Sequence, residues 1–144
     1  MSRVKLLMLM GIIGALLLSA CGGKQTGRNS PVEVKVVLNE FTIESSVTEF
    51  KPGVQYRFTV TNEGVVAHEF MIASVTMDVM EMAAMSMEQK DALALTMITE
   101  DKLPAGATAF IEYTFTSVPE GNMELICALP GHIEAGMYTP ITVK

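Results

Sequence analysis

The sequence predicts an all-β sandwich of about eight strands with one helical insert, preceded by an export segment. Three observations carry this prediction. Short runs of alternating apolar and polar residues recur from residue 32 to the end of the chain, and turn residues separate them. One internal stretch, residues 76–98, lacks Gly and Pro and is rich in Ala, Leu and Met. The first 20 residues have the charge and hydropathy of a signal peptide.

The length and composition fit one globular domain. A chain of 144 residues is long enough for a single domain, and a hydrophobic fraction of 49% excludes a disordered protein. Ten Lys and Arg against sixteen Asp and Glu give a net charge of −6, which argues against nucleic acid as a partner. With two His, two Cys and no Trp, any metal or catalytic site must use very few residues.

Residues 1–20 are predicted to be a lipoprotein signal peptide. Arg3 and Lys5 precede an apolar run over residues 6–18, which is too short to cross about 30 Å of hydrocarbon. The run ends in the sequence LSAC, which resembles the bacterial lipobox, where the Cys thiol receives a diacylglycerol. We therefore expect lipidation of Cys21 and a membrane anchor that faces the periplasm or the extracellular side. The alternative is an ordinary signal peptide with a Cys close by.

Residues 21–31 are predicted to be the lipidated Cys and a flexible tether, because this stretch is Gly-rich, polar and without an apolar period. The domain then spans residues 32–144. Two Cys in an exported chain would normally suggest a disulfide. If Cys21 carries a lipid, Cys127 remains as a single exported thiol. Metal ligation would explain such a thiol.

The strands are predicted from period-two alternation. In the clearest run, Tyr56, Phe58 and Val60 share a face, and polar residues alternate with them. Turn residues such as Pro52-Gly53 separate the runs. Strands are expected over residues 32–36, 54–60, 67–72, 111–115, 123–127 and 138–143.

Residues 77–97 are the expected helical insert, which the turn at residues 103–106 ends. Two interpretations of its Met residues stay open. In one, flexible Met side chains pack as a flap against the sandwich. In the other, the thioethers take up Cu(I) or dock a redox partner. Five of them follow the pattern M-x2-M-x-M-x2-M-x-M, which forms no single apolar stripe on a helix: Met77, Met80, Met82, Met85 and Met87.

The chemistry gathers near the C-terminus. Cys127, His132 and Met137 follow the spacing C-x4-H-x4-M, and His68 lies in a predicted strand 59 residues before Cys127. Two His and one Cys with a weak axial Met form the blue-copper arrangement. We therefore predict that these four residues bind one type 1 copper. Taken singly, each of them is equally compatible with a place in an apolar core.

Residues 32–144 resemble the cupredoxins, the single-domain blue-copper proteins. The Cys-x-x-Pro-Gly-His stretch that ends at His132 is similar to azurin, and the four-residue gap before Met137 is more similar to rusticyanin and auracyanin. The segment Ala67–Phe70 stands in the place of the family's His-Asn-aromatic motif, and the insert stands where azurin-like members carry a helical flap. The resemblance implies an eight-stranded Greek-key sandwich that binds one copper and shuttles one electron.

One residue departs from the family pattern. The family commonly has Asn after the first His, and the Asn amide helps to hold the ligand loop. This chain has Glu69, which has no side-chain N–H when it is ionised. Because contacts around the Cys sulfur tune the centre, the family's potentials are not expected to apply here.

We expect a monomeric, membrane-anchored electron carrier outside the cytoplasm, with a cytochrome or an oxidase-like protein as its redox partner. The alternative is copper binding for delivery or tolerance, with the Met-rich insert as the point of entry. An enzyme is not expected, because oxidase or nitrite reductase chemistry needs further His-rich copper centres and the chain has only two His.

Replacement of Cys21 by Ala tests the predicted anchor. The variant should stay unlipidated and leave the detergent phase on partitioning, because the thiol that accepts the lipid is gone. Partitioning and the mass of the mature protein measure this result. A wild-type mature protein that lacks any lipid mass would contradict the lipobox assignment.

Overall fold

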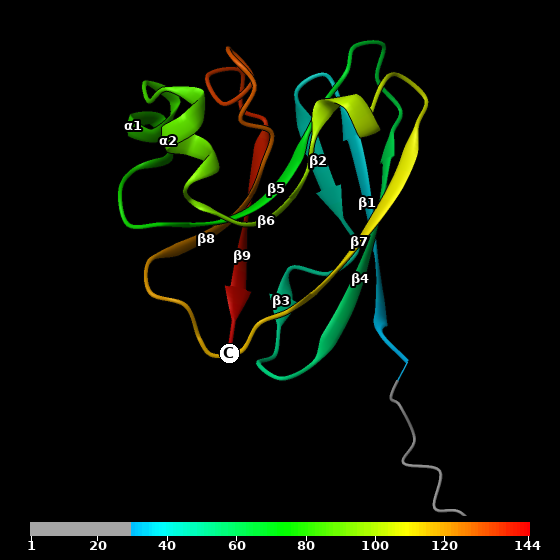
Figure 1. The fold of residues 1–144 in the computed structure, drawn as a ribbon, viewed down its shortest axis with the longest axis vertical. Helices are drawn as coiled ribbons and strands as arrows, with labels where there is room; N and C mark the ends of the chain where they lie inside the picture. The colour runs from blue at the N-terminus through cyan, green and yellow to red at the C-terminus, as the bar shows by residue number, and fades with distance from the viewer. Residues whose placement is uncertain (1–29) are drawn as a thin grey trace, which may run out of the picture.

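The described part of the chain forms two facing β-sheets. A computed structural model describes residues 30–144; the predicted signal peptide, Cys21 and most of the predicted tether lie outside these residues. Figure 1 shows the sheets as two layers. One sheet has the strand order β2-β1-β4-β7 and the other β3-β9-β8-β5-β6. The strands are β1 (Val32–Asn39), β2 (Thr42–Ser45), β3 (Glu49–Phe50), β4 (Gln55–Asn62), β5 (Phe70–Val75), β6 (Ala94–Ile98), β7 (Thr108–Thr114), β8 (Asn122–Ile126) and β9 (Tyr138–Val143).

The predicted sandwich is confirmed, with nine strands in residues 30–144. Two of them, β2 and β3, are four and two residues long and have little alternation for the sequence to show. Two neighbouring pairs, β1 with β4 and β3 with β9, are parallel, and the other pairs are antiparallel. Parallel neighbours require crossover connections, so the chain passes between the sheets as a sandwich demands.

Aromatic side chains fill the space between the sheets. The predicted inward residues of β4, Tyr56, Phe58 and Val60, are buried there, as the alternation indicates. Phe58 lies with its ring centroid 5.6 Å from that of Phe50 and 5.7 Å from that of Phe70. Each fully buried side chain of this size contributes about 1.5–3 kcal/mol, so this cluster supplies a large share of the fold's stability.

The insert covers the outer face of the second sheet. Helices α1 (Val79–Ala83) and α2 (Met87–Asp91) lie beside this sheet and away from β1 and β4 (Figure 1). Strand β5 is consequently buried on both faces. Under the helices, Met71 of β5, Met82 of α1 and Ile133 of the β8–β9 loop belong to a second apolar cluster. The insert and this loop therefore share one core.

The expected helix over residues 77–97 is instead two one-turn helices followed by β6. The Asp78 side chain accepts from the N–H of Met80 and caps α1, and Ser86 forms a capping box with Gln89 that starts α2. Residues after Leu93 pair with β5, for example Met97 with Met71. Short helices are marginal on their own, so caps and strand pairing prevail over the helix propensity of the segment.

The two ends of the sandwich differ. The loop between β8 and β9, drawn in orange at the top of Figure 1, lies at one end together with the β1–β2 turn and the short 3₁₀ helix η1 (Glu100–Lys102). Strand β1 begins at the opposite end, where β9 finishes. Within residues 30–144, every helix is too short or too polar to cross a bilayer.

Candidate metal centre

Three predicted ligands meet at the end of the sandwich that carries the β8–β9 loop. The Sγ of Cys127 lies 3.2 Å from the Nδ1 of His132 and 3.9 Å from the Nδ1 of His68. The two Nδ1 atoms are 3.4 Å apart. A point equidistant from the three atoms therefore lies about 2 Å from each, which is close to metal–nitrogen and metal–sulfur bond lengths. The donor atoms fit a metal ion held in a trigonal plane.

Strand pairing places His68 beside Cys127. His68 precedes β5 and Cys127 follows β8, and these antiparallel strands pair Met71 with Ile126. The segment before His68 is fixed by Asn62, whose side-chain N–H groups donate to the carbonyls of Val66 and Leu103. His68 itself is fully buried. Its ring is thus held by the sheet rather than by a free loop.

A tight turn returns His132 to the same point. Gly131 has a φ of 84°, a left-handed conformation that favours glycine, so the Pro130-Gly131 pair turns the chain between Cys127 and His132. The amide of His132 donates to the Leu129 carbonyl, and the amide of Ala135 donates to the Gly131 carbonyl. These bonds form a compact turn between the two ligands of the loop.

Met137 is tied to both loop ligands through its backbone. Its amide donates to the His132 carbonyl at 2.9 Å, and its carbonyl accepts from the Cys127 amide at 3.1 Å. The side chain is fully buried and belongs to the same core cluster as Cys127. Met137 is thus held beside the loop ligands, where its thioether would complete the His2CysMet donor set of a type 1 copper centre.

Burial keeps the donors uncharged before metal binding. It raises the pKa of the Cys127 thiol to about 11, against which the hydrogen bond from the Glu69 amide to Sγ acts in the lowering direction. Burial also lowers the pKa of His68 and of His132, so the neutral imidazoles that bind metals predominate at neutral pH. Metal binding must then displace only the thiol proton.

The two His ligands differ in their exposure. His68 is enclosed, whereas His132 is half-buried and packs edge-on against Phe41, with ring centroids 5.1 Å apart. Phe41 is itself 38% exposed. His132 is therefore the ligand nearest to the surface.

Three charged residues lie around the ligands, and two of them, Glu40 and Lys90, were not singled out from the sequence. Glu40 accepts from the amides of Val65 and Val66, and one of its oxygens lies 3.7 Å from the Nε2 of His68. Glu69 accepts from the Ala128 amide, and Lys90 of α2 is buried beside the Ala128 carbonyl. No local pattern marks Glu40 or Lys90, because both reach the site only through the tertiary fold.

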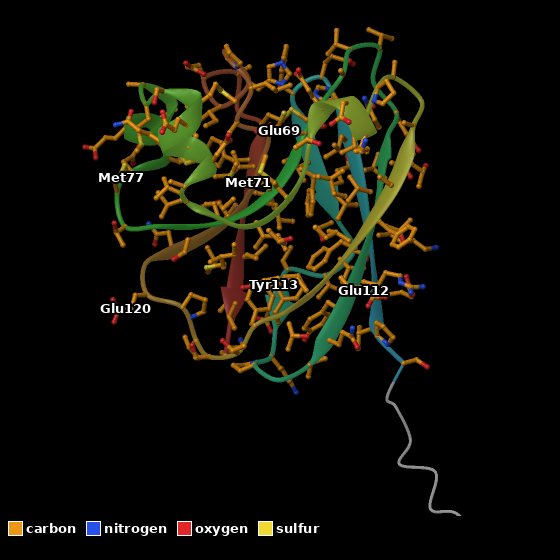
Figure 2. All side chains as sticks on the ribbon, viewed as in Figure 1. Glu69, Met71, Met77, Glu112, Tyr113 and Glu120 are labelled. Carbon is orange, nitrogen blue, oxygen red and sulfur yellow. The ribbon has the colours of Figure 1, made fainter. Side chains whose placement is uncertain are left out.

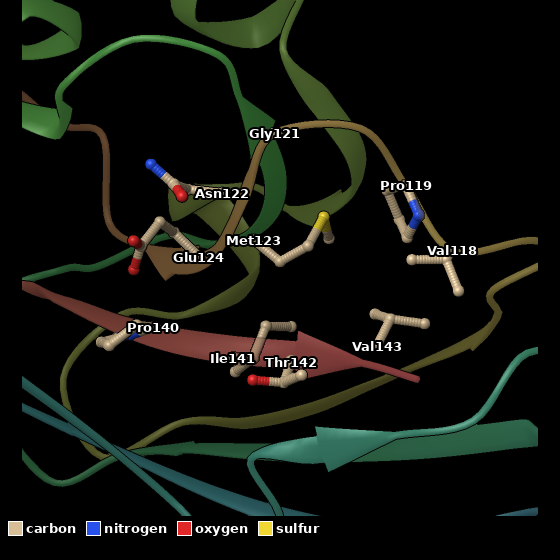
Figure 3. Close-up of a pocket in the computed structure, with 10 residues that line it drawn as sticks. All are labelled: Val118, Pro119, Gly121, Asn122, Met123, Glu124, Pro140, Ile141, Thr142 and Val143. Carbon is tan, nitrogen blue, oxygen red and sulfur yellow. The ribbon is translucent and has the colours of Figure 1, made fainter.

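A cavity elsewhere holds none of the predicted ligands. It has a volume of about 260 Å³ and lies between β8, β9 and the loop before β8, where Met123, Ile141 and Val143 line it (Figure 3). This is the end of the sandwich opposite the β8–β9 loop. We therefore assign the candidate metal centre to the ligand cluster and not to this cavity.

Comparisons with known proteins agree with this site. The chain is 32% identical to the copper-resistant cuproprotein CopI of Rubrivivax gelatinosus over 116 residues, which cover 77% of this chain and 66% of that protein. It is 27% identical to CopI of Pseudomonas aeruginosa over 138 residues, which cover 77% of this chain and 75% of that protein. The chain thus spans just under two thirds of the length of the first relative. No protein-family model matches it.

Solved structures share the fold. A reduced auracyanin from Roseiflexus castenholzii superposes with a TM-score of 0.57 at 18% identity, covering 82% of this chain and 99% of that one. Reduced rusticyanin gives a TM-score of 0.53 at 20% identity, with coverages of 80% and 81%. The chain therefore has the cupredoxin fold, and its ligand cluster fits a type 1 copper centre.

Replacement of Cys127 by Ser tests the ligand set. Copper-loaded wild type should show the strong thiolate-to-Cu(II) absorption of a blue-copper protein, and the variant should lose this band because a hard oxygen replaces the soft sulfur. The visible spectrum of the loaded protein measures it. Ile133→Val, in the same loop but without a donor atom, should keep the band. A wild type that binds Cu(II) and stays colourless would contradict the trigonal thiolate site.

Proposed function

We propose that this protein is a one-electron carrier that works outside the cytoplasm and is anchored to a membrane by a lipid on Cys21. The convergence of His68, Cys127 and His132 on one point supports the proposal most directly. When bound, the copper supplies the one-electron couple between Cu(I) and Cu(II). The work of the chain is to hold the donor atoms so that both oxidation states are accommodated.

The ligand residues are held by rigid elements. His68 is fixed through β5, and the β8–β9 loop is fixed through backbone bonds from Met137 to Cys127 and to His132. Donor atoms held in this way move little when the charge of the metal changes. A small rearrangement keeps electron exchange fast, which favours a carrier function.

Burial gives the electron one short path to a partner. His68, Cys127 and Met137 are enclosed and exclude water from the site. His132 reaches the surface beside Phe41. A redox partner, such as a cytochrome or an oxidase, would therefore approach the end of the sandwich that carries His132.

The position of the first described strand suits an anchor. Strand β1 begins at the end of the sandwich opposite the ligand loop (Figure 1). A lipid attached through residues 21–31 would leave the copper end directed away from the membrane. This orientation supports an anchored carrier that meets its partner on the far side.

A redox titration of the copper-loaded protein tests the carrier function. The blue band should bleach reversibly with one electron per chain, because one type 1 copper is bound and the donors stay in place. Optical titration against mediators measures the stoichiometry. Reduction that releases the copper, or that fails to reverse, would contradict a carrier and favour copper delivery or tolerance.

A role in copper tolerance is the second candidate, and the relatives favour it. Both curated relatives are described as copper-resistant cuproproteins. The Met-rich insert offers thioethers that could gather Cu(I), but most of them are packed. Met80 is 47% exposed, whereas Met82 is fully buried and Met77 and Met85 lie against the second apolar cluster. Tolerance would then depend on the type 1 centre rather than on the insert.

A Met-to-Leu variant of the insert separates these possibilities. Replacement of its five patterned Met keeps the apolar volume but removes the sulfur atoms. We expect the variant to fold, to turn blue and to bind one Cu(I) per chain, as in the wild type. The residues replaced are Met77, Met80, Met82, Met85 and Met87.

Equilibrium titration with Cu(I) measures the stoichiometry. Met71→Leu, a buried change in β5 within the same apolar cluster, controls for altered packing. Wild-type protein that binds more than one Cu(I), reduced to one in the five-residue variant, would show that the insert gathers copper.

A further inference from the structure

Lys90 is a buried basic residue beside the second apolar cluster, because it contacts Ala128, which belongs to that cluster. Its side chain comes from α2 in the insert, and the residue is only 3% exposed. A lone ammonium group is costly to bury, so its surroundings must compensate it. Its Nζ lies 3.4 Å from the carbonyl oxygen of Ala128, the residue directly after the Cys127 ligand.

The N–H group of Ala128 contacts a second buried charged residue, Glu69. The N–H of Ala128 donates to Oε1 of Glu69 at 2.9 Å, and Glu69 is 3% exposed. The backbone N–H of Glu69 in turn donates to the Cys127 Sγ at 3.4 Å. Glu69 lies at the ligand end of the sandwich, beyond Met71 of β5 (Figure 2). The Ala128 backbone is therefore held between an acidic and a basic side chain.

We propose that Lys90 is a positioning residue of the copper centre. Lys90 holds the Ala128 carbonyl while Glu69 holds the Ala128 N–H, and together they fix the Cys127 sulfur. The positive charge of Lys90 also favours Cu(I) over Cu(II). The proposal rests on the type 1 copper site proposed above. By this proposal, the insert influences the copper centre through Lys90 and does more than pack over the sheet.

The direction of the effect follows from Coulomb's law. A positive charge enclosed beside the residue that follows Cys127 destabilises Cu(II) more than Cu(I). Bulk water and salt screen it little there, although the acidic Glu69 side chain offsets part of it. An exposed Lys has far less influence, because water and salt screen it. Lys102 of η1 provides this comparison, since its side chain is 68% exposed and pairs with Asp101.

The test compares Lys90→Met, which removes the charge and the donor, with Lys102→Met, which removes an exposed charge. At a fixed solution potential, Lys90→Met should shift the ratio of Cu(II) to Cu(I) about tenfold toward Cu(II). It should also shift the position of the blue band, because the Cys127 sulfur is held less firmly. Lys102→Met should change the ratio less than twofold and leave the band in place.

Lys90→Gln keeps an N–H donor without the charge and covers the case in which the Met variant fails to fold. It should keep the wild-type band but shift the copper ratio in the same direction as Lys90→Met. Equal copper ratios in wild type and Lys90→Gln would overturn the electrostatic effect of Lys90.

A measurement on the metal-free protein separates this proposal from the copper assignment. Amide hydrogen exchange at Ala128 should be faster in Lys90→Met than in wild type, since the backbone loses one of its two anchors. Unchanged exchange at Ala128, with a blue band and a copper ratio like those of Lys102→Met, would overturn the role of Lys90. A colourless wild type with faster exchange in the variant would instead overturn the copper site alone.

Discussion

The pairing of β5 with β8 is the constraint on which the metal centre depends. It brings residues 59 positions apart, His68 and Cys127, to the same end of one sheet. Side chains alternate along a strand, so a slip of one residue would turn every side chain of β5 to the other face. Both faces of β5 are buried, one against the aromatic core and one against the insert. The register is therefore fixed from both sides, and the ligand geometry with it.

The same burial that fixes the ligands also controls their charge. In the metal-free protein it keeps the thiol of Cys127 protonated and both imidazoles neutral, since charged forms are costly in an apolar site. A thiolate becomes favourable only when a cation takes the place of the proton. Enclosure thus keeps the three donors neutral in the metal-free protein around neutral pH, so their charge changes on metal binding rather than with small changes of pH.

Much of this could be predicted from the sequence, because the decisive signals are local. Alternation shows the inward side of β4, and the spacing of Cys127, His132 and Met137 with a Pro-Gly turn between them indicates the ligand loop. The insert could not be predicted as well. Its composition favours helix, but the Ser86 capping box and the pairing of β6 with β5 decide the outcome. Glu40 and Lys90 meet the site only through contacts between distant segments, which leave no pattern along the chain.

Glu69 is noticeable in the sequence, but its contacts are visible only in the structure. From the sequence it is only a departure from the cupredoxin pattern, an acidic residue where an amide donor is common. In the structure its backbone N–H still donates to the Cys127 sulfur, a bond that does not depend on side-chain type. Its carboxyl group accepts from Ala128, so the side chain that lacks a donor anchors the loop as an acceptor instead. Burial raises the pKa of the Glu69 carboxyl group, and Lys90, which the insert brings over the sheet, acts on that pKa in the lowering direction. The carboxyl group that replaces the family's amide and the Lys90 side chain of the insert thus both contact the backbone of Ala128, the residue directly after the Cys127 ligand.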